Sequence, residues 1–213
     1  MKNFYRIKTE RLVIRKIKPC RQDAKFISLL WKNKRVMKFV GFPNGIEEKE
    51  EKIIEKTKNR QKRGDEYHLI VELNGKAIGE ALIGYNKESK IAETDVKIMP
   101  EFWGNGYGRE IKSALVKWIF KNTDSKGVKA TPNVKNKASI KMQESVGGKR
   151  IKKMHFSFPS DMKSFTKDLD CYVYIVYRED WEKKQKSKLV TGTLVRWLKT
   201  KSKKREKLRD CFK

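Results

Sequence analysis

The spacing of apolar and polar positions along the chain predicts a series of strands and helices. Residues 9–17 alternate roughly as a strand does, and residues 22–31 carry apolar side chains at helical spacing. We expect Asp23 to be the N-cap of that helix. Residues 36–43 are predicted to form an irregular hydrophobic link. Residues 47–63 predict a charged helix whose acidic start and basic end suit the helix dipole.

The middle of the chain predicts an antiparallel meander. Strands are expected on both sides of Asn74-Gly75, a pair that is typical of tight hairpin turns. The later elements expected in chain order are strand 91–99, helix 109–120, short strand 128–132 and a closing strand from residue 170. This order predicts an α/β fold with a mixed, mostly antiparallel central sheet flanked by helices.

A glycine-rich turn lies between the predicted strand 91–99 and the helix that follows it. Gly104, Gly106 and Gly108 let the backbone turn tightly and approach a ligand closely. The unpaired N–H groups and the dipole of the next helix favour a phosphate there. Arg109 stands where a dinucleotide-binding fingerprint needs its third glycine, and no Gly-Lys-Ser/Thr of a P-loop follows.

The run from Trp103 to Arg109, Trp-Gly-Asn-Gly-Tyr-Gly-Arg, resembles the pyrophosphate loop of the GNAT N-acetyltransferase superfamily. That loop is written Gln/Arg-x-x-Gly-x-Gly/Ala, and a Trp at its start is similar to the ribosomal-protein N-acetyltransferase (RimJ/RimL-like) branch. Three more stretches resemble the branch in the right order, and together the four cover residues 8–182. They are Thr9-Glu-Arg-Leu, Asn136 with Ser139 and Gly147, and the closing Asp170 to Trp181 segment.

The resemblance implies a GNAT fold and a direct transfer of acetyl from acetyl-CoA to a primary amine. The acceptor would be a protein N-terminus or a small-molecule amine, and no metal is expected. The residues implied to hold acetyl-CoA are Lys97, Ile98, Met99, Trp103, Gly104, Asn105, Gly106, Tyr107, Gly108, Arg109 and Asn136. For Asn136 an alternative is a purely local role as a helix N-cap.

Two residues are candidates for the chemistry. Glu93 precedes the loop on the central strand, where a half-buried carboxylate would have a raised pKa and could accept the amine proton. The alternative is a solvated charge. Ser139 matches the serine that the branch places near the departing thiolate, and the alternative is a serine tolerated in a helix's first turn. Gln143 stands where many relatives carry a tyrosine general acid.

Charge and composition widen the choice of partners. The chain of 213 residues has 53 lysines and arginines against 26 acidic residues, a formal net charge of +27, which favours anionic partners unless it only reflects a lysine-rich composition. The absence of a long apolar run or signal segment predicts a protein with no transmembrane segment. Three widely spaced cysteines indicate a reducing, cytoplasmic location.

The C-terminal stretch lies outside the resemblance. We divide the chain into an acetyltransferase domain, residues 1–182, and a basic tail, residues 183–213. Residues 182–213 hold 13 lysines and arginines against 3 acidic residues, a net charge of +10, with apolar residues at helical spacing. This predicts a basic amphipathic helix that binds an anionic partner, or one that packs on its own domain or in a homodimer. Two rival functions stay open, an acetyl-CoA-binding protein with weak catalysis and a ribosome- or nucleic-acid-associated basic protein.

Overall fold

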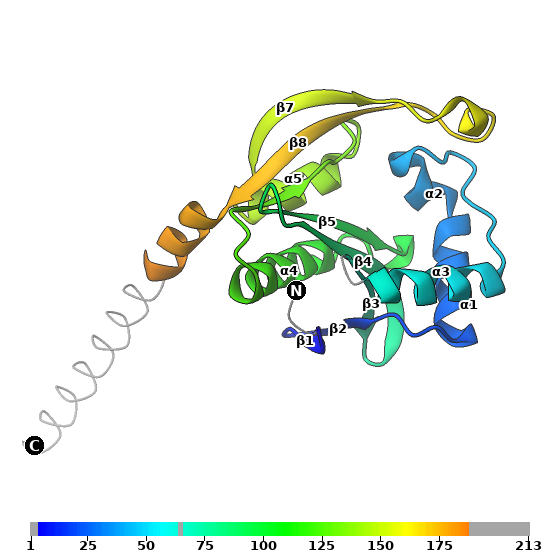
Figure 1. The fold of residues 1–213 in the computed structure, drawn as a ribbon, viewed down its shortest axis with the longest axis horizontal. Coiled ribbons are helices and arrows are strands. Elements are labelled where there is room, and N and C mark those ends of the chain that lie inside the picture. Colours follow the sequence, from blue (N-terminus) through cyan, green and yellow to red (C-terminus); the bar gives the residue numbers. More distant parts are fainter. Residues whose placement is uncertain (1–3, 64–65, 188–213) are drawn as a thin grey trace, which may run out of the picture. The chain divides into compact units, whose positions relative to one another are not determined.

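The computed structural model describes residues 4–63 and 66–187, and the chain divides into two units, Met1–Tyr177 and Arg178–Lys213. The first unit is built on an eight-stranded sheet in the order β1-β2-β3-β4-β5-β6-β8-β7 (Figure 1). The strands are β1 (Arg6–Lys8), β2 (Leu12–Lys16), β3 (Glu66–Leu73), β4 (Lys76–Asn86), β5 (Ile91–Ile98), β6 (Gly127–Ala130), β7 (Lys149–Phe156) and β8 (Leu169–Tyr177). All neighbours pair antiparallel except β5 and β6, which are parallel. The predicted mixed, mostly antiparallel α/β fold is confirmed.

Helices cover both faces of this sheet (Figure 1). They are α1 (Arg21–Lys32), α2 (Lys34–Met37), α3 (Glu50–Arg63), α4 (Tyr107–Asn122) and α5 (Lys137–Ser145), with 3-10 turns η1 (Lys38–Val40), η2 (Pro100–Phe102) and η3 (Ser160–Met162). One core cluster joins Ile27 of α1, Ile53 of α3 and Ile70 of β3, all of them buried. Burial of apolar side chains of this size stabilises the fold by about 1.5–3 kcal/mol each.

The two faces are distinguished by the alternation of side chains along β5. Lys97 lies 3.0 Å from Glu80 of β4, and Glu80 also accepts a hydrogen bond from Trp31 of α1. Thr94 faces the opposite side, where it accepts a hydrogen bond from Lys112 of α4. Consequently β5 presents one set of side chains to α1 and the other set to α4.

The hairpin predicted at Asn74-Gly75 is confirmed. Both residues have positive φ, 50° and 79°, and they connect β3 directly to β4. A turn with two positive φ values matches the right-handed twist of the strands, which is why Asn-Gly is favoured there. The turn therefore fixes the register of β4, the strand on which β5 is paired.

Two local predictions are wrong. Residues 36–43 contain regular structure, because Asn33 caps α2 by accepting hydrogen bonds from the N–H groups of Arg35 and Val36, and η1 follows directly. Asp23 is not an N-cap, since α1 begins after Cys20. The buried Asp23 carboxylate instead accepts hydrogen bonds from Arg15, at 2.7 and 2.8 Å, and from the backbone N–H of Lys18.

The second unit is described only as far as Ser187. Residues 178–187 are helical, and Arg178 lies 3.4 Å from Glu182 within that helix. The predicted amphipathic stripe lies in residues 188–213, outside the described residues. In the described parts of the chain, no helix combines the length and the apolar character needed to cross a membrane.

Candidate active site

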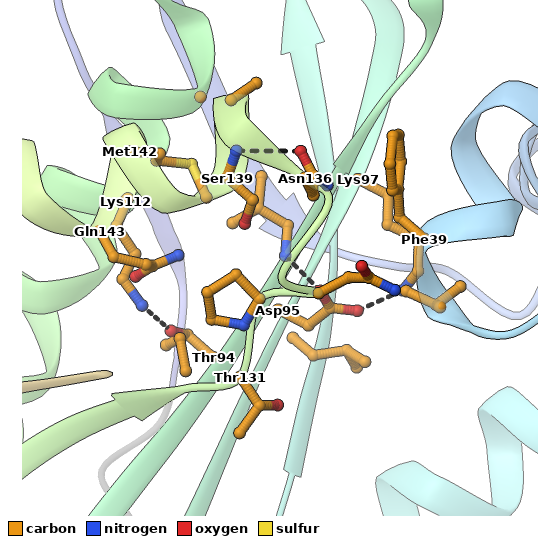
Figure 2. A pocket seen from close by; sticks show the side chains of 18 of the residues that line it. Phe39, Thr94, Asp95, Lys97, Lys112, Thr131, Asn136, Ser139, Met142 and Gln143 are labelled. Atoms are coloured by element: carbon orange, nitrogen blue, oxygen red, sulfur yellow. Dashed lines mark hydrogen bonds and ion pairs between the residues drawn. The ribbon is translucent and has the colours of Figure 1, made fainter. Parts of the chain in front are cut away.

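Strands β5 and β6 part shortly after they meet. They pair at Ile91–Gly127, Ala92–Val128 and Glu93–Lys129, and their ladder then ends although β5 continues to Ile98. A cavity of about 1220 Å³ lies where the strands diverge, and it is lined by β5, the glycine loop, α4 and α5 (Figure 2). The parting leaves backbone polar groups of β5 on the cavity side without β6 as partner, which suits a ligand with polar groups of its own.

The glycine loop forms one end of this cavity. Gly104 and Gly106 have left-handed φ values of 80° and 78°, a conformation that other residues rarely adopt. Gly106 immediately precedes α4, so the free N–H groups of that helix's first turn lie at the cavity. A side chain at Gly108 would come within 3.1 Å of Met142 Sδ, so this glycine lets α4 and α5 approach closely.

The turn between β1 and β2 braces this loop. Arg11 Nε donates to Glu110 in the first turn of α4 at 2.7 Å, and Arg11 Nη1 donates to the carbonyl oxygen of Asn105 at 3.0 Å. The Arg11 guanidinium also lies 4.5 Å from the centre of the Tyr107 ring. Thr9 donates a further hydrogen bond to Glu110. The Thr9-Glu-Arg-Leu stretch therefore has a structural purpose, because it fixes the start of α4.

Eleven of the thirteen residues predicted for the site line this cavity, and Met99 and Asn105 do not. Met99 packs against the cluster of Leu30, Val36 and Met37. The Asn105 amide donates to the carbonyl oxygens of Phe102 and Trp103 and so shapes the loop. The structure thus brings most of the predicted residues together from three separate parts of the chain.

Asn136 is the N-cap of α5, because its side chain accepts a hydrogen bond from the Ser139 N–H at 3.1 Å (Figure 2). Both residues line the cavity. At the other end of α5, a side chain on Gly148 would come within 2.7 Å of the Gln143 carbonyl oxygen. A larger residue at position 148 would therefore require the backbone after α5 to shift.

The carboxylates near the cavity are all paired with cations. Glu93 has a side chain 60% exposed and forms an ion pair with Lys129, so it lies at the rim and is less buried than the sequence suggests. Asp95 pairs with Lys97, which also lies 3.0 Å from Glu80. Burial alone would raise the pKa of Glu80, but Lys97 and His68 hold it well below its usual range.

Lys112 is a cavity residue that sequence analysis missed. Its side chain is buried, with the residue only 1% exposed, and its ammonium donates to Thr94 Oγ1 (Figure 2). Burial lowers the pKa of Lys112 to about 7, and the nearby charge of Asp95 opposes that shift. A signal was available, because position 112 lies on the same helical face as the buried Leu115, Val116 and Ile119.

A family model and several solved structures match this chain. A family model described as an acetyltransferase (GNAT) domain matches residues 11–149. No curated protein has a sequence that matches this chain significantly. Several solved structures share the fold at low sequence identity.

An acetyltransferase (GNAT family) from Bacillus anthracis is 24% identical with a TM-score of 0.64, over 82% of this chain and 99% of that one. A spermidine N-acetyltransferase from Vibrio cholerae, solved with CoA and spermine, is 19% identical with a TM-score of 0.69, over 80% and 98% of the two chains. RimL, a ribosomal L7/L12 alpha-N-protein acetyltransferase, is 14% identical with a TM-score of 0.65, over 81% and 93%.

Proposed function

Because the chain belongs to the GNAT family and is an acetyl-CoA-dependent N-acetyltransferase, we propose that acetyl-CoA binds where β5 and β6 part. The acceptor we propose is a primary amine, of a protein N-terminus or of a small molecule. The observation that carries the proposal is the meeting of the parted strands and the glycine loop at one cavity. We also propose that the chain belongs to the RimJ/RimL-like branch. The Thr9 to Leu12 stretch, which resembles that branch, holds the glycine loop and the start of α4 through Glu110.

The residues fit acetyl-CoA in two ways. The pyrophosphate is proposed to lie on the N–H groups between Gly104 and Arg109, where the helix dipole favours negative charge. The pantetheine arm is proposed to run beside Lys97 and Ile98, along the edge of β5 that β6 leaves free. Asn136 contributes by capping α5 at the wall of the cavity, and no direct contact from the side chain of Met99 or Asn105 is needed.

The acetyl group arrives as a thioester, and the chain's own residues handle the protons. Glu93 is proposed as the base for the acceptor amine, because its carboxylate lies at the rim of the cavity and an ion pair with Lys129 holds it there. The Ser139 hydroxyl is proposed to hydrogen-bond the departing sulfur. Direct transfer to the amine is proposed, because burial raises the pKa of the Cys171 thiol in this cavity and so disfavours the thiolate that an acetyl-cysteine intermediate would need.

A panel of acceptors tests the activity and its class. Peptides with free N-termini, peptides with blocked N-termini and linear polyamines are each incubated with acetyl-CoA, and free thiol is measured. We expect release of CoA with one class of primary amine and none with its blocked form. If no amine in the panel increases thiol release above the rate with water, the proposed acceptor class is wrong.

Binding is tested separately by thermal unfolding. Acetyl-CoA should raise the melting temperature of the wild type by mass action. Gly106→Asp should remove that increase, because a carboxylate would occupy the proposed pyrophosphate site. Gly75→Asp is the matched control, since Gly75 has a similar φ of 79° and open space around it in the β3–β4 turn. An increase that survives in Gly106→Asp contradicts the proposed position of the pyrophosphate.

A further inference from the structure

Lys112 is buried at a position where an apolar side chain would cost less free energy than an ammonium. It lies on the face of α4 that packs against the sheet, next to the fully buried Ile111 and in line with Leu115. Burying an ammonium costs far more than burying a methylene chain of the same length. A position of this kind is therefore a candidate for function when it also lines a cavity, as Lys112 does.

The surroundings of the Lys112 ammonium are polar but almost uncharged. Thr94 of β5 accepts its hydrogen bond, and Gln143 of α5, a neutral residue that is 4% exposed, lines the same cavity. Asp95 of β5 is the charged group that acts on it, and that carboxylate is already paired with Lys97. Lys112 thus has a proton to give and a hydroxyl, not a carboxylate, as its hydrogen-bond partner.

We propose that Lys112 is the general acid of the transfer and gives its proton to the departing thiolate of CoA. This inference rests on the proposed place of acetyl-CoA between β5 and β6. The amine nitrogen forms a bond to the acetyl carbon, the carbon–sulfur bond breaks, and its electron pair stays on sulfur. The proton of the Lys112 ammonium then passes to sulfur, and the proton that the amine nitrogen loses leaves through Glu93 to solvent. Neutral Lys112 regains a proton from solvent before the next turnover.

Relative acidity decides whether such a transfer is favourable. A free thiol has a pKa of about 8.5 and a free lysine one of about 10.4, so an ordinary lysine would hold its proton against a thiolate. With a pKa of about 7, the Lys112 ammonium is the stronger acid of the two. This value also keeps both forms populated near neutral pH, which general acid catalysis requires. The role fits a site in which Gln143 cannot act as an acid.

The experiment compares Lys112→Met with Lys117→Met, which removes the same charge from an exposed position of the same helix. We measure turnover with the best amine of the panel at several pH values, and CoA binding by thermal unfolding. Lys112→Met should lower turnover by roughly 100-fold or more near neutral pH. The ratio of wild-type to Lys112→Met turnover should fall as the pH rises above about 7, because the wild type loses the Lys112 proton there. Lys117→Met should change neither turnover nor its dependence on pH.

A third variant separates charge from proton donation. Lys112→Arg keeps a positive charge that it cannot give up as a proton, so it should bind CoA and still fail to restore turnover. Wild-type turnover in Lys112→Met, or a ratio of the two turnover rates that does not change with pH, overturns the role of Lys112 and leaves the proposed function intact. Lack of CoA binding by the wild type overturns both. Loss of CoA binding in Lys112→Met alone would make the residue structural and also refute the inference.

Discussion

Replacing Lys112 by methionine should change how the stability of the protein depends on pH. The pKa of Lys112 falls from an ordinary 10.5 to about 7 on folding, because burial disfavours its charged form. Below pH 7 both states hold the proton, and the folded state bears the full cost of the buried charge. Between pH 7 and 10.5 only the unfolded chain keeps the proton, so the free energy of unfolding rises with pH.

The size of the effect follows from the shift. A difference of 10.5 minus 7, or 3.5 pKa units, corresponds to about 5 kcal/mol over the whole window, at about 1.4 kcal/mol for each unit. Between about pH 6 and about pH 9, roughly 3 kcal/mol of that change should be visible. Lys112→Met lacks the titrating group, so its stability should exceed that of the wild type at the lower pH, and the gap should close as pH rises.

Urea unfolding of both proteins at several pH values measures this gap. The comparison isolates Lys112, because Asp95 and every other titrating group are present in both proteins. The transition slope should agree between the two proteins, since the same surface is exposed on unfolding. A difference in the free energy of unfolding that stays constant from acid to alkaline pH would show that Lys112 keeps an ordinary pKa, and the reasoning from burial would be refuted.

Three further predictions concern the reaction and the tail. Ser139→Ala should lower turnover by roughly 10- to 1000-fold and spare acetyl-CoA binding; an unchanged rate would leave the serine a local helix role. Joint replacement of Cys20, Cys171 and Cys211 by serine should keep turnover within a few-fold, and lost activity in a folded variant would indicate an acetyl-cysteine intermediate. Truncation after Glu182 should spare turnover on a small amine and weaken RNA binding most at low salt. A lower melting temperature without that selective loss would favour a packing role for the tail.

The parts of the site that depend on backbone shape were predictable from sequence. Gly104 and Gly106 stand where φ is positive, and Asn74-Gly75 forms the turn that the pair implies. Such positions admit few residue types, so the residue type reveals the conformation. The same holds for Asn136, whose residue type allowed its role as a helix N-cap to be one of the two predictions.

Features that depend on tertiary partners were not predictable. Asp23 is of a residue type that often caps helices. Its carboxylate instead accepts hydrogen bonds from Arg15 and from the Lys18 N–H, both outside its helix. The helix α2 has four residues, too few for a period to be visible. Lys112 stands on an apolar helical face, and only the parting of β5 and β6 shows that this face reaches a cavity.

The parted strands also bear on how the newly made chain folds. Strands β3, β4 and β5 are joined by short turns and pair with one another, whereas β6 joins β5 through three parallel residue pairs after α4 has intervened. Local pairings form early and the N-terminal part emerges first from the ribosome, so we expect a stage at which β5 is an open edge. Its charged Asp95 and Lys97, and Pro100 just beyond its end, are residue types that discourage an open edge from pairing with other chains. The edge proposed to receive the ligand is thus also the edge at which the nascent chain must avoid aggregation.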